Sequence, residues 1–308
     1  MAAIHTENLS KTYGGGLRGK KSVALRGLTL EVREGEIFGF LGPNGAGKTS
    51  TIHLLLNLIR PTSGSASLFG LPVTDAEVHR RVGYLPESVN LHDYYHGRKL
   101  LNFYAVLAGV PDAARSGRVA EMLRLFALED AADKVVSKYS KGMAQRIGFA
   151  QALLHDPDLL LLDEPTSSLD PVGRKEFRDI LLELKRRGKT VFISSHILSE
   201  VETVCDRVAI LQQGELKRIG TLQELSAGRS TKFIVKSLPA PALESIAATA
   251  AEITLAQGLV TIRCQNESCR KEIECLLELH GVQITQRETV AQSLEEIFFS
   301  TINSSKTS

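Results

Sequence analysis

One short segment constrains the fold of this chain more than any other: it reads Gly42-Pro43-Asn44-Gly45-Ala46-Gly47-Lys48-Thr49, and Ser50 follows it. Two glycines five residues apart, followed by Lys and Thr, form the phosphate-loop pattern. An apolar run at 37–41 precedes the loop, and apolar residues with helical spacing follow it, namely Ile52, Leu55, Leu56 and Ile59. A buried strand, a glycine-rich loop and a helix are the context in which this loop binds phosphate, so the sequence predicts a nucleotide-binding α/β domain.

The residue types in this loop suit a nucleotide triphosphate. Gly45 and Gly47 allow backbone N–H groups to turn inward around phosphate oxygens. Lys48 supplies a positive charge to the β and γ phosphates, and the Thr49 hydroxyl is a ligand for Mg²⁺. A helix that begins at Lys48 adds the positive end of its dipole. The alternative is a chance glycine-rich turn, and the flanking strand and helix argue against it.

An acidic pair follows a second apolar run. The run Leu159–Leu162 is typical of a central strand, and Asp163 and Glu164 come directly at its carboxyl end, where such sheets bind ligands. We expect Asp163 to hold Mg²⁺, and Glu164, which faces the other way, to polarise water for attack on the γ-phosphate. The alternative is an acidic strand end without a chemical role.

The order of apolar patterns predicts two domains. Strand-like runs alternate with helical patterns, which is typical of a parallel sheet covered by helices; the later strands are at 190–194 and 208–211, with a helix at 171–187. This ATP-binding domain is expected over residues 1–225, with a helical insert over about 97–154. After a linker at 226–230, residues 231–303 predict a small ferredoxin-like α+β domain, with strands at 232–236 and 282–286, a hairpin around 257–258, and helices at 240–249, 267–279 and 294–302.

Composition excludes several classes of function. The 37 basic and 35 acidic residues leave a net charge of +2, so no nucleic-acid partner is expected. Four cysteines in 308 residues do not form a disulfide framework, which favours the cytoplasm. No apolar run is long enough to span a membrane, and residues 1–10 lack the apolar stretch of a signal peptide. The glycine-rich basic stretch at 14–21 is expected to be a hairpin tip, with contact to phosphate or lipid headgroups as the alternative.

A third motif narrows the class, because helicases, GTPases and kinases also contain a phosphate loop and an acidic pair. The segment before the acidic pair reads Tyr139-Ser140-Lys141-Gly142-Met143-Ala144-Gln145-Arg146, which resembles the signature segment of ABC-type ATPases. Matching positions occur in the family's order over residues 1–225, and they are Tyr13, the segment Thr166-Ser167-Ser168-Leu169-Asp170, and His196 after Ser194-Ser195.

The resemblance implies roles for these residues. Tyr13 would stack on adenine, the loop from Gly42 to Ser50 would bind ATP, and Glu164, His196 and Lys48 would form the catalytic group. Ser140 and Gly142 would present a hydroxyl and N–H groups at the start of a helix expected from Met143 onward. That surface and the loop ending at Asp170 would meet ATP held by a second copy, so that ATP joins a head-to-tail homodimer and a monomer hydrolyses poorly.

Two positions depart from the family pattern. Glu87 follows Gly83-Tyr84-Leu85-Pro86, where the family commonly has Gln as a ligand of Mg²⁺ and water, so the implied metal ligands are Thr49, Asp163 and Glu87. The signature reads Ser-Lys-Gly-Met where Ser-Gly-Gly-Gln is usual. This form of the signature resembles that of ATPase subunits of bacterial multidrug or polysaccharide exporters with a separate membrane subunit. Two further segments share the resemblance, Ser-Ser-His-Ile-Leu-Ser-Glu-Val-Glu at 194–202 and Ser-Leu-Glu-Glu-Ile-Phe at 293–298.

The resemblance therefore implies an ATPase with ATP and Mg²⁺ that drives export through a membrane-spanning permease subunit. The chain would lie at the cytoplasmic face of the inner membrane, and residues 84–96 would contact the permease. One alternative is a soluble ABC ATPase acting on nucleic acid or the ribosome, but the single phosphate loop and the lack of sustained heptads argue against it. Another is a purely regulatory nucleotide-binding protein, which an intact Glu164 argues against. The chain has no mark of the transported substrate.

Overall fold

The computed structural model describes residues 1–14, 21–92, 94–225, 229–249, 251–256, 259–264, 267–291 and 293–303. The expected hairpin tips at 15–20 and 257–258 and most of the expected linker lie outside these ranges. The chain forms two compact units, Met1–Ile219 and Gly220–Ser308, and each is described by itself. Within the described ranges, no helix combines the length and apolar character that a membrane span requires.

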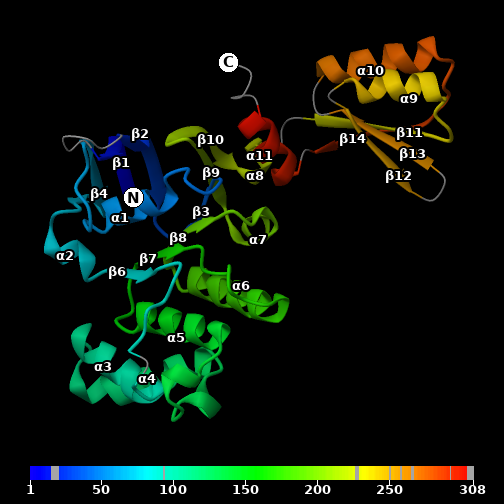
Figure 1. Ribbon diagram of the computed structural model, residues 1–308. Coiled ribbons are helices and arrows are strands. Elements are labelled where there is room, and N and C mark those ends of the chain that lie inside the picture. Colours follow the sequence, from blue (N-terminus) through cyan, green and yellow to red (C-terminus); the bar gives the residue numbers. More distant parts are fainter. Residues whose placement is uncertain are drawn as a thin grey trace. The chain divides into compact units, whose positions relative to one another are not determined.

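A six-stranded sheet forms the centre of the first unit (Figure 1), in the order β10-β9-β3-β8-β7-β6. Strand β3 pairs in parallel with β8 and β9, and β7 pairs in parallel with β6 and β8. All residues of β3, β7 and β8 are buried, because helices and a second sheet cover both faces. The strands are β3 (Ile37–Leu41), β6 (Val82–Leu85), β7 (Leu159–Asp163), β8 (Thr190–Ser195), β9 (Arg207–Gln212) and β10 (Glu215–Thr221).

A second, antiparallel sheet of the first unit has the order β2-β1-β4-β5. Its strands are β1 (Ala2–Tyr13), β2 (Ser22–Arg33), β4 (Ser63–Leu68) and β5 (Leu71–Pro72). Helix α1 (Lys48–Leu55) shares one hydrophobic core with both sheets, which includes Ile4, Leu28, Phe40, Ile52 and Phe192. The first unit thus has the predicted fold, with a parallel-sheet core and an antiparallel β subdomain.

The remaining helices of the first unit are α2 (Ala76–His79), α3 (Gly97–Leu107), α4 (Asp112–Leu125), α5 (Lys141–Leu153), α6 (Pro171–Arg186) and α7 (Leu198–Val204). Two short 3₁₀ turns, Glu129–Ala131 and Val136–Lys138, lie between α4 and α5. Helices α3, α4 and α5 pack against one another, and α5 contacts the edge strand β6 (Figure 1). The stretch from α3 to α5 is therefore a helical insert in the sheet domain.

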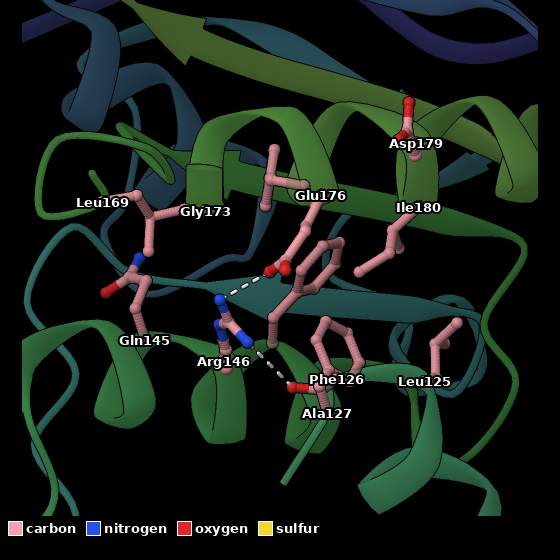
Figure 2. Close-up of a pocket in the computed structure, with 12 residues that line it drawn as sticks. Leu125, Phe126, Ala127, Gln145, Arg146, Leu169, Gly173, Glu176, Asp179 and Ile180 are labelled. Atoms are coloured by element: carbon pink, nitrogen blue, oxygen red, sulfur yellow. Dashed lines mark hydrogen bonds and ion pairs between the residues drawn. The ribbon is translucent and has the colours of Figure 1, made fainter. Parts of the chain in front are cut away.

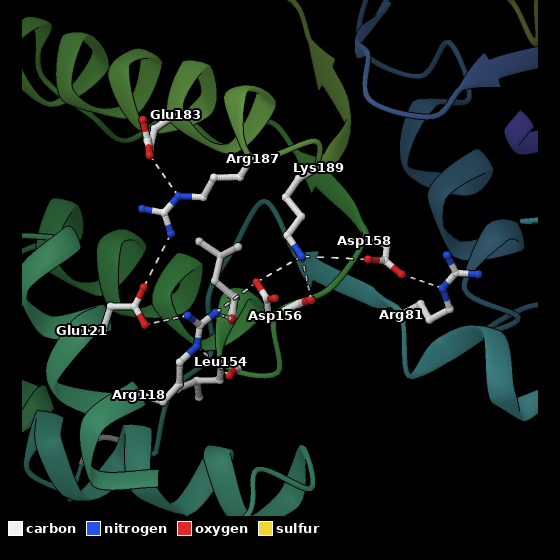
Figure 3. A network of polar contacts seen from close by, with 10 residues as sticks. Arg81, Arg118, Glu121, Leu154, Asp156, Asp158, Glu183, Arg187 and Lys189 are labelled. Carbon is white, nitrogen blue, oxygen red and sulfur yellow. Dashed lines mark hydrogen bonds and ion pairs between the residues drawn. The ribbon is translucent and has the colours of Figure 1, made fainter. Parts of the chain in front are cut away.

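A polar network links α4 to the end of α5 and to the core (Figure 3). The guanidinium of Arg118 donates to the carbonyl oxygens of Leu153, at 2.6 Å, and Leu154, at 3.0 Å, at the end of α5. It also pairs with Glu121, and Glu121 lies 3.6 Å from Arg187 of the core. The last carbonyl groups of a helix have no N–H donor from a following turn, so the Arg118 guanidinium supplies the donors at the end of α5.

Helices α5 and α6 form a second junction between the insert and the core (Figure 2). Arg146 of α5 lies 2.5 Å from Glu176 of α6, and the Phe149 and Phe177 rings pack with their centroids 5.0 Å apart. A cavity of about 280 Å³ remains beside these side chains. The helix with the signature segment is thus held to the core by an ion pair and by aromatic packing.

The second unit has the predicted ferredoxin-like order of strands and helices. Its sheet has the order β12-β13-β11-β14, and the pairs are antiparallel. The elements are β11 (Arg229–Val235), α9 (Ala240–Ala247), β12 (Glu252–Ala256), β13 (Leu259–Cys264), α10 (Glu267–Leu279) and β14 (Ile284–Ala291). Phe233, Ile262 and Ile273 lie in its core. Helix α8 (Leu222–Leu225) contacts α11 (Leu294–Asn303) within this unit.

The linker prediction at 226–230 was wrong at its end. Strand β11 begins at Arg229, because Arg229 and Ser230 pair with Ala291 and Val290 of β14. Cross-strand pairing recruits two polar residues that sequence propensity alone assigns to a loop.

Candidate active site

The loop between β3 and α1 forms a tight cradle that requires its glycines. Gly45 and Gly47 have φ angles of +78° and +111°, a region that residues with a side chain rarely adopt. A Cβ atom added at Gly47 would lie 2.3 Å from the carbonyl oxygen of Ala24, and one at Gly42 would lie 2.5 Å from that of Leu211. The backbone therefore passes this close to β2 and β9 only because these positions are glycine.

A cavity of about 460 Å³ opens over this cradle. Its lining combines residues from both sheets, the loop after β6 and the ends of β7 and β8. They are Tyr13, Ser22, Val23, Ala24, Asn44, Gly45, Ala46, Gly47, Lys48, Thr49, Ser50, Glu87, Glu164 and His196. Most of the predicted ATP-binding and catalytic residues therefore meet at one cavity.

The Lys48 side chain lies within the cradle and is 6% exposed. Its ammonium donates to the carbonyl oxygen of Gly42 at 2.7 Å and lies 3.1 Å from Glu164 Oε1. The second contact is an ion pair without the alignment of a hydrogen bond. A buried charge needs such a partner, so Glu164 compensates Lys48 at the floor of the cavity.

Glu164 also contacts the segment after β8. Its Oε2 lies 2.7 Å from Nδ1 of His196, and the backbone N–H of His196 donates to the same oxygen at 3.3 Å. Glu164 has a φ of +47°, a left-handed backbone that costs about 1–3 kcal/mol for a residue with a side chain. Its N–H donates to the backbone oxygen of Ser194 at 3.2 Å and to the Ser194 hydroxyl at 3.1 Å, which stabilises this conformation.

Asp163 lies behind the cavity rather than in its lining. It is 1% exposed, and Oδ1 accepts a hydrogen bond of 2.5 Å from the Ser194 hydroxyl. Burial, and secondarily the charge of Asp163, raises the pKa of Tyr84 to about 12. The sequence prediction overlooked Ser194 as a contact of both acidic residues, although a hydroxyl at the end of the adjacent strand was visible in the sequence.

The proposed metal ligands supply only oxygen atoms. Thr49 and Glu87 are exposed in the cavity lining, and Asp163 is adjacent to Glu164. Such oxygen donors fit Mg²⁺, which typically takes one or two carboxylates and completes its sphere with water and substrate phosphates. The described parts of the chain contain no cluster of three or more His, Cys, Asp or Glu side chains that would hold a metal ion. The oxygen donors of Thr49, Asp163 and Glu87 fit a magnesium ion that binds together with a nucleotide.

Tyr13 lies at the edge of the cavity, at the end of β1. Its hydroxyl is 3.2 Å from the Ser50 hydroxyl, and the ammonium of Lys11 lies 5.1 Å from its ring centroid. The residue is 39% exposed. An aromatic ring in this position offers a surface for stacking next to the phosphate cradle.

Ser140, Gly142 and Asp170 do not line this cavity. Ser140 caps α5, and its hydroxyl accepts from the N–H of Met143 at 3.2 Å. The helix therefore begins at Lys141, earlier than the predicted start at Met143. Asp170 caps α6 in the same manner, and its Oδ1 accepts from the N–H of Gly173 at 2.8 Å. Both capping residues are exposed.

The comparisons with known proteins agree with this geometry. The family model for ABC transporters matches residues 25–167. An uncharacterized ABC transporter ATP-binding protein of Nostoc sp. is 48% identical over 236 residues, or 76% of this chain and 70% of that protein. The bacitracin transport ATP-binding protein of Enterococcus faecalis is 35% identical over 302 residues, which cover 96% of this chain and 94% of that protein. A solved dimeric ATP-binding cassette in a post-hydrolysis state, bound to ADP and Pi, has a TM-score of 0.65 and 26% identity, covering 71% of this chain and 98% of that one.

Proposed function

Because the chain belongs to the family of ATP-binding proteins of ABC transporters, we propose that two copies hydrolyse ATP between them and thereby drive a separate membrane-spanning permease. One observation supports this most directly. Lys48, Glu164 and His196 meet at one cavity. The N-terminus of α5, which Ser140 caps and which could bind a phosphate, lies outside that cavity. One chain thus offers two different halves of a site.

The cavity suits the binding of ATP. The phosphates would lie in the cradle, where inward N–H groups and the Lys48 ammonium neutralise their charge. Lys48 would then exchange its contact with Glu164 for one with phosphate. The base would stack on Tyr13 at the cavity edge. Thr49, Asp163 and Glu87 would hold Mg²⁺, which supplies positive charge against the phosphate oxygens when bound.

Glu164 is the candidate general base for hydrolysis. Its carboxylate would take a proton from a water molecule whose oxygen attacks the γ-phosphorus, and ADP leaves as the bond to its oxygen breaks. His196 is hydrogen-bonded to that carboxylate, so it would orient the base and contact the γ-phosphate. The ion pair with Lys48 would hold the Glu164 carboxylate at the floor of the cavity until the nucleotide binds.

A second copy would complete each site. The Ser140 hydroxyl, the N–H groups near Gly142 and the positive end of α5 would meet the γ-phosphate of the partner. Asp170 would hold the loop before α6 against the partner, since it caps that helix. The dimeric state of the solved ATP-binding cassette supports this arrangement.

The permease contact is proposed at residues 84–96, at the cytoplasmic face of the inner membrane. Tyr94 is 69% exposed, and its ring packs on Tyr95 with centroids 4.8 Å apart. Phe103 of α3 stacks on Tyr95 at 5.7 Å. Exposed aromatic rings held by a helix suit an apolar protein segment. A relative from Burkholderia orbicola, the Nod factor export ATP-binding protein I, is 40% identical over 216 residues, and this supports export as the direction.

Substitution of Glu164 by Gln tests the proposed site. The amide keeps the shape of the side chain but does not accept a proton, so kcat should fall by about 10² to 10⁴. ATP binding should persist, and light scattering with ATP should show a stable dimer. Asp→Asn replacement at the exposed residue Asp179 on α6 is a control for the loss of one charge. Turnover at the native rate in Glu164→Gln, or a monomer with bound ATP, would contradict the proposal.

A further inference from the structure

We propose that Glu200 is a positioning residue for Glu164, which it aligns through the loop 165–170 and Arg174. This inference rests on the proposed role of Glu164 as the general base. Glu200 lies on α7, on the segment that begins with His196. It is not among the residues that line the ATP cavity, so it would act through the backbone rather than on the nucleotide.

Glu200 joins the two ends of the loop. Its Oε2 accepts a short hydrogen bond from the hydroxyl of Thr166, and its Oε1 lies 3.3 Å from Nε of Arg174. The same Arg174 nitrogen donates to the carbonyl oxygen of Leu169 at 3.1 Å. Thr166 begins the loop after Pro165, and Leu169 is its last residue before the cap of α6. A single carboxylate therefore fixes both ends of this loop.

The loop is the continuation of a strained residue. Glu164 has the left-handed φ of +47°, and its carbonyl oxygen accepts from the N–H of Ser167 at 3.2 Å. Strained backbone persists only where the surrounding contacts hold it. Ser194 holds Glu164 from the side of the sheet, whereas the contacts of Thr166 hold the chain after it. Release of Thr166 would let the backbone of Glu164 relax and move its carboxylate.

Glu200 also links the base to its orienting histidine by a second route. The direct contact between Glu164 and His196 is 2.7 Å long. The second route runs from the start of α7 through Glu200 to Thr166, and so to Glu164. A carboxylate suits this role because it accepts from a hydroxyl with one oxygen and pairs with a guanidinium with the other.

A cavity next to the contact between Glu200 and Thr166 leaves the loop room to move if the carboxylate is removed. A cavity of about 250 Å³ lies between α6 and α7, and Thr166, Arg174 and Glu200 are part of its lining. Without the Glu200 side chain, the loop has room to shift toward this cavity. Displacement of a reacting group by about 1 Å is enough to lower a rate about 10²-fold.

The test compares steady-state ATP hydrolysis of Glu200→Ala, Glu200→Gln and Arg174→Ala in the full chain. We expect kcat to fall about 10- to 100-fold in Glu200→Ala, with KM for ATP changed less than about twofold. Glu200→Gln keeps an acceptor for Thr166 and should recover to within about threefold of the native kcat. Glu202→Ala on the exposed side of α7 and Lys175→Ala on α6 are matched controls that should retain native kcat.

The double variant Glu164→Gln/Glu200→Ala separates this inference from the proposed function. If Glu200 acts through Glu164, the double variant should be no slower than Glu164→Gln alone. Native kcat in Glu200→Ala, with Glu164→Gln inactive, would overturn the role of Glu200 only. Native kcat in Glu164→Gln would overturn the assignment of the base itself. If Glu200→Ala does not fold, the variants Arg174→Ala and Glu200→Gln test the inference instead. Native kcat in Arg174→Ala, together with no recovery of kcat in Glu200→Gln, would overturn it.

Discussion

The phosphate cradle and the start of α5 are both proposed to bind phosphate, but they differ in how much of a binding site each one forms. The cradle lies at a cavity with a buried cation, a carboxylate and a histidine in contact with one another. The start of α5 has one exposed capping serine and a half-buried glycine, Gly142, beside it. A Cβ atom added at Gly142 would make only ordinary van der Waals contacts, at 3.8 Å from Leu169 and 4.0 Å from the Ser140 hydroxyl, so that helix start is less tightly enclosed than the cradle.

This difference supports the proposal that two copies form each site together. A helix start binds phosphate weakly by itself, because its dipole and N–H groups act mainly within the first turn. The cradle supplies the Lys48 charge and encloses part of a cavity. Each region lacks what the other provides, and the two lie in separate places in one chain. We therefore expect composite sites between two copies.

Replacement of Lys48 by Ala breaks the cradle and should have the largest effect. It removes the cation that would neutralise the phosphates, and it leaves the buried Glu164 carboxylate without its contact to the Lys48 ammonium. ATP binding should be abolished, as measured by equilibrium dialysis with radiolabelled ATP. Lys175→Ala, at an exposed position, is the control. Native affinity in Lys48→Ala would contradict the assignment of the cradle.

Mixing two damaged copies sharpens the comparison. Ser140→Asp keeps a helix cap but places a negative charge against the γ-phosphate, whereas Ser140→Asn keeps the cap without the charge. Ser140→Asp and Lys48→Ala should each be inactive alone. An equimolar mixture forms heterodimers with one intact composite site, so ATPase activity should return to about a quarter of native.

Two outcomes would count against this picture. No recovery in the mixture, with heterodimers present by native mass spectrometry, would mean that the two regions do not share a site. Near-native activity in Ser140→Asp would show that the start of α5 does not meet phosphate. Ser140→Asn should retain more activity than Ser140→Asp, because only the latter repels the nucleotide.

Replacement of Asp170 by Ala should have the smallest effect. The hydrogen bond of 2.8 Å to the N–H of Gly173 is lost, which costs about 1 kcal/mol for a typical N-cap. Thermal unfolding should shift downward by about 2–4 °C for a unit of this size. Asp170→Asn keeps the cap and is the control. An unchanged midpoint in Asp170→Ala would mean that the cap does not stabilise α6.

The sequence predicted much of the fold because its signals are local. Apolar runs and glycine-rich turns gave the strands β3, β7, β8 and β9 and the helix α1, whose residues are determined by burial and by chain geometry. The order of elements in the second unit gave its ferredoxin-like fold. The boundaries of the elements were predicted less accurately. The Ser140 cap decides where α5 begins, and pairing with β14 decides where β11 begins.

The details of the site required the tertiary structure. Ser194 lies far from Asp163 in sequence but contacts it because β7 and β8 are neighbours in the sheet. Likewise, Glu200 and Arg174 meet the loop after Glu164 only because α6 and α7 pack together. Sequence patterns contain no direct record of such contacts between distant residues.

The amino-acid sequence by itself therefore determined the type of chemistry. A glycine-rich loop, a lysine and an acidic pair at a strand end suit a nucleotide, because the backbone freedom of glycine and the charges of lysine and the carboxylates are properties of residue type. Only the folded structure decided which groups touch. The ion pair of Lys48 with Glu164, the left-handed backbone of Glu164 and the placement of Ser140 outside the cavity all depend on packing between segments far apart in the chain. Local preferences do not encode these distances, because they arise when buried side chains of many elements are fitted together at once.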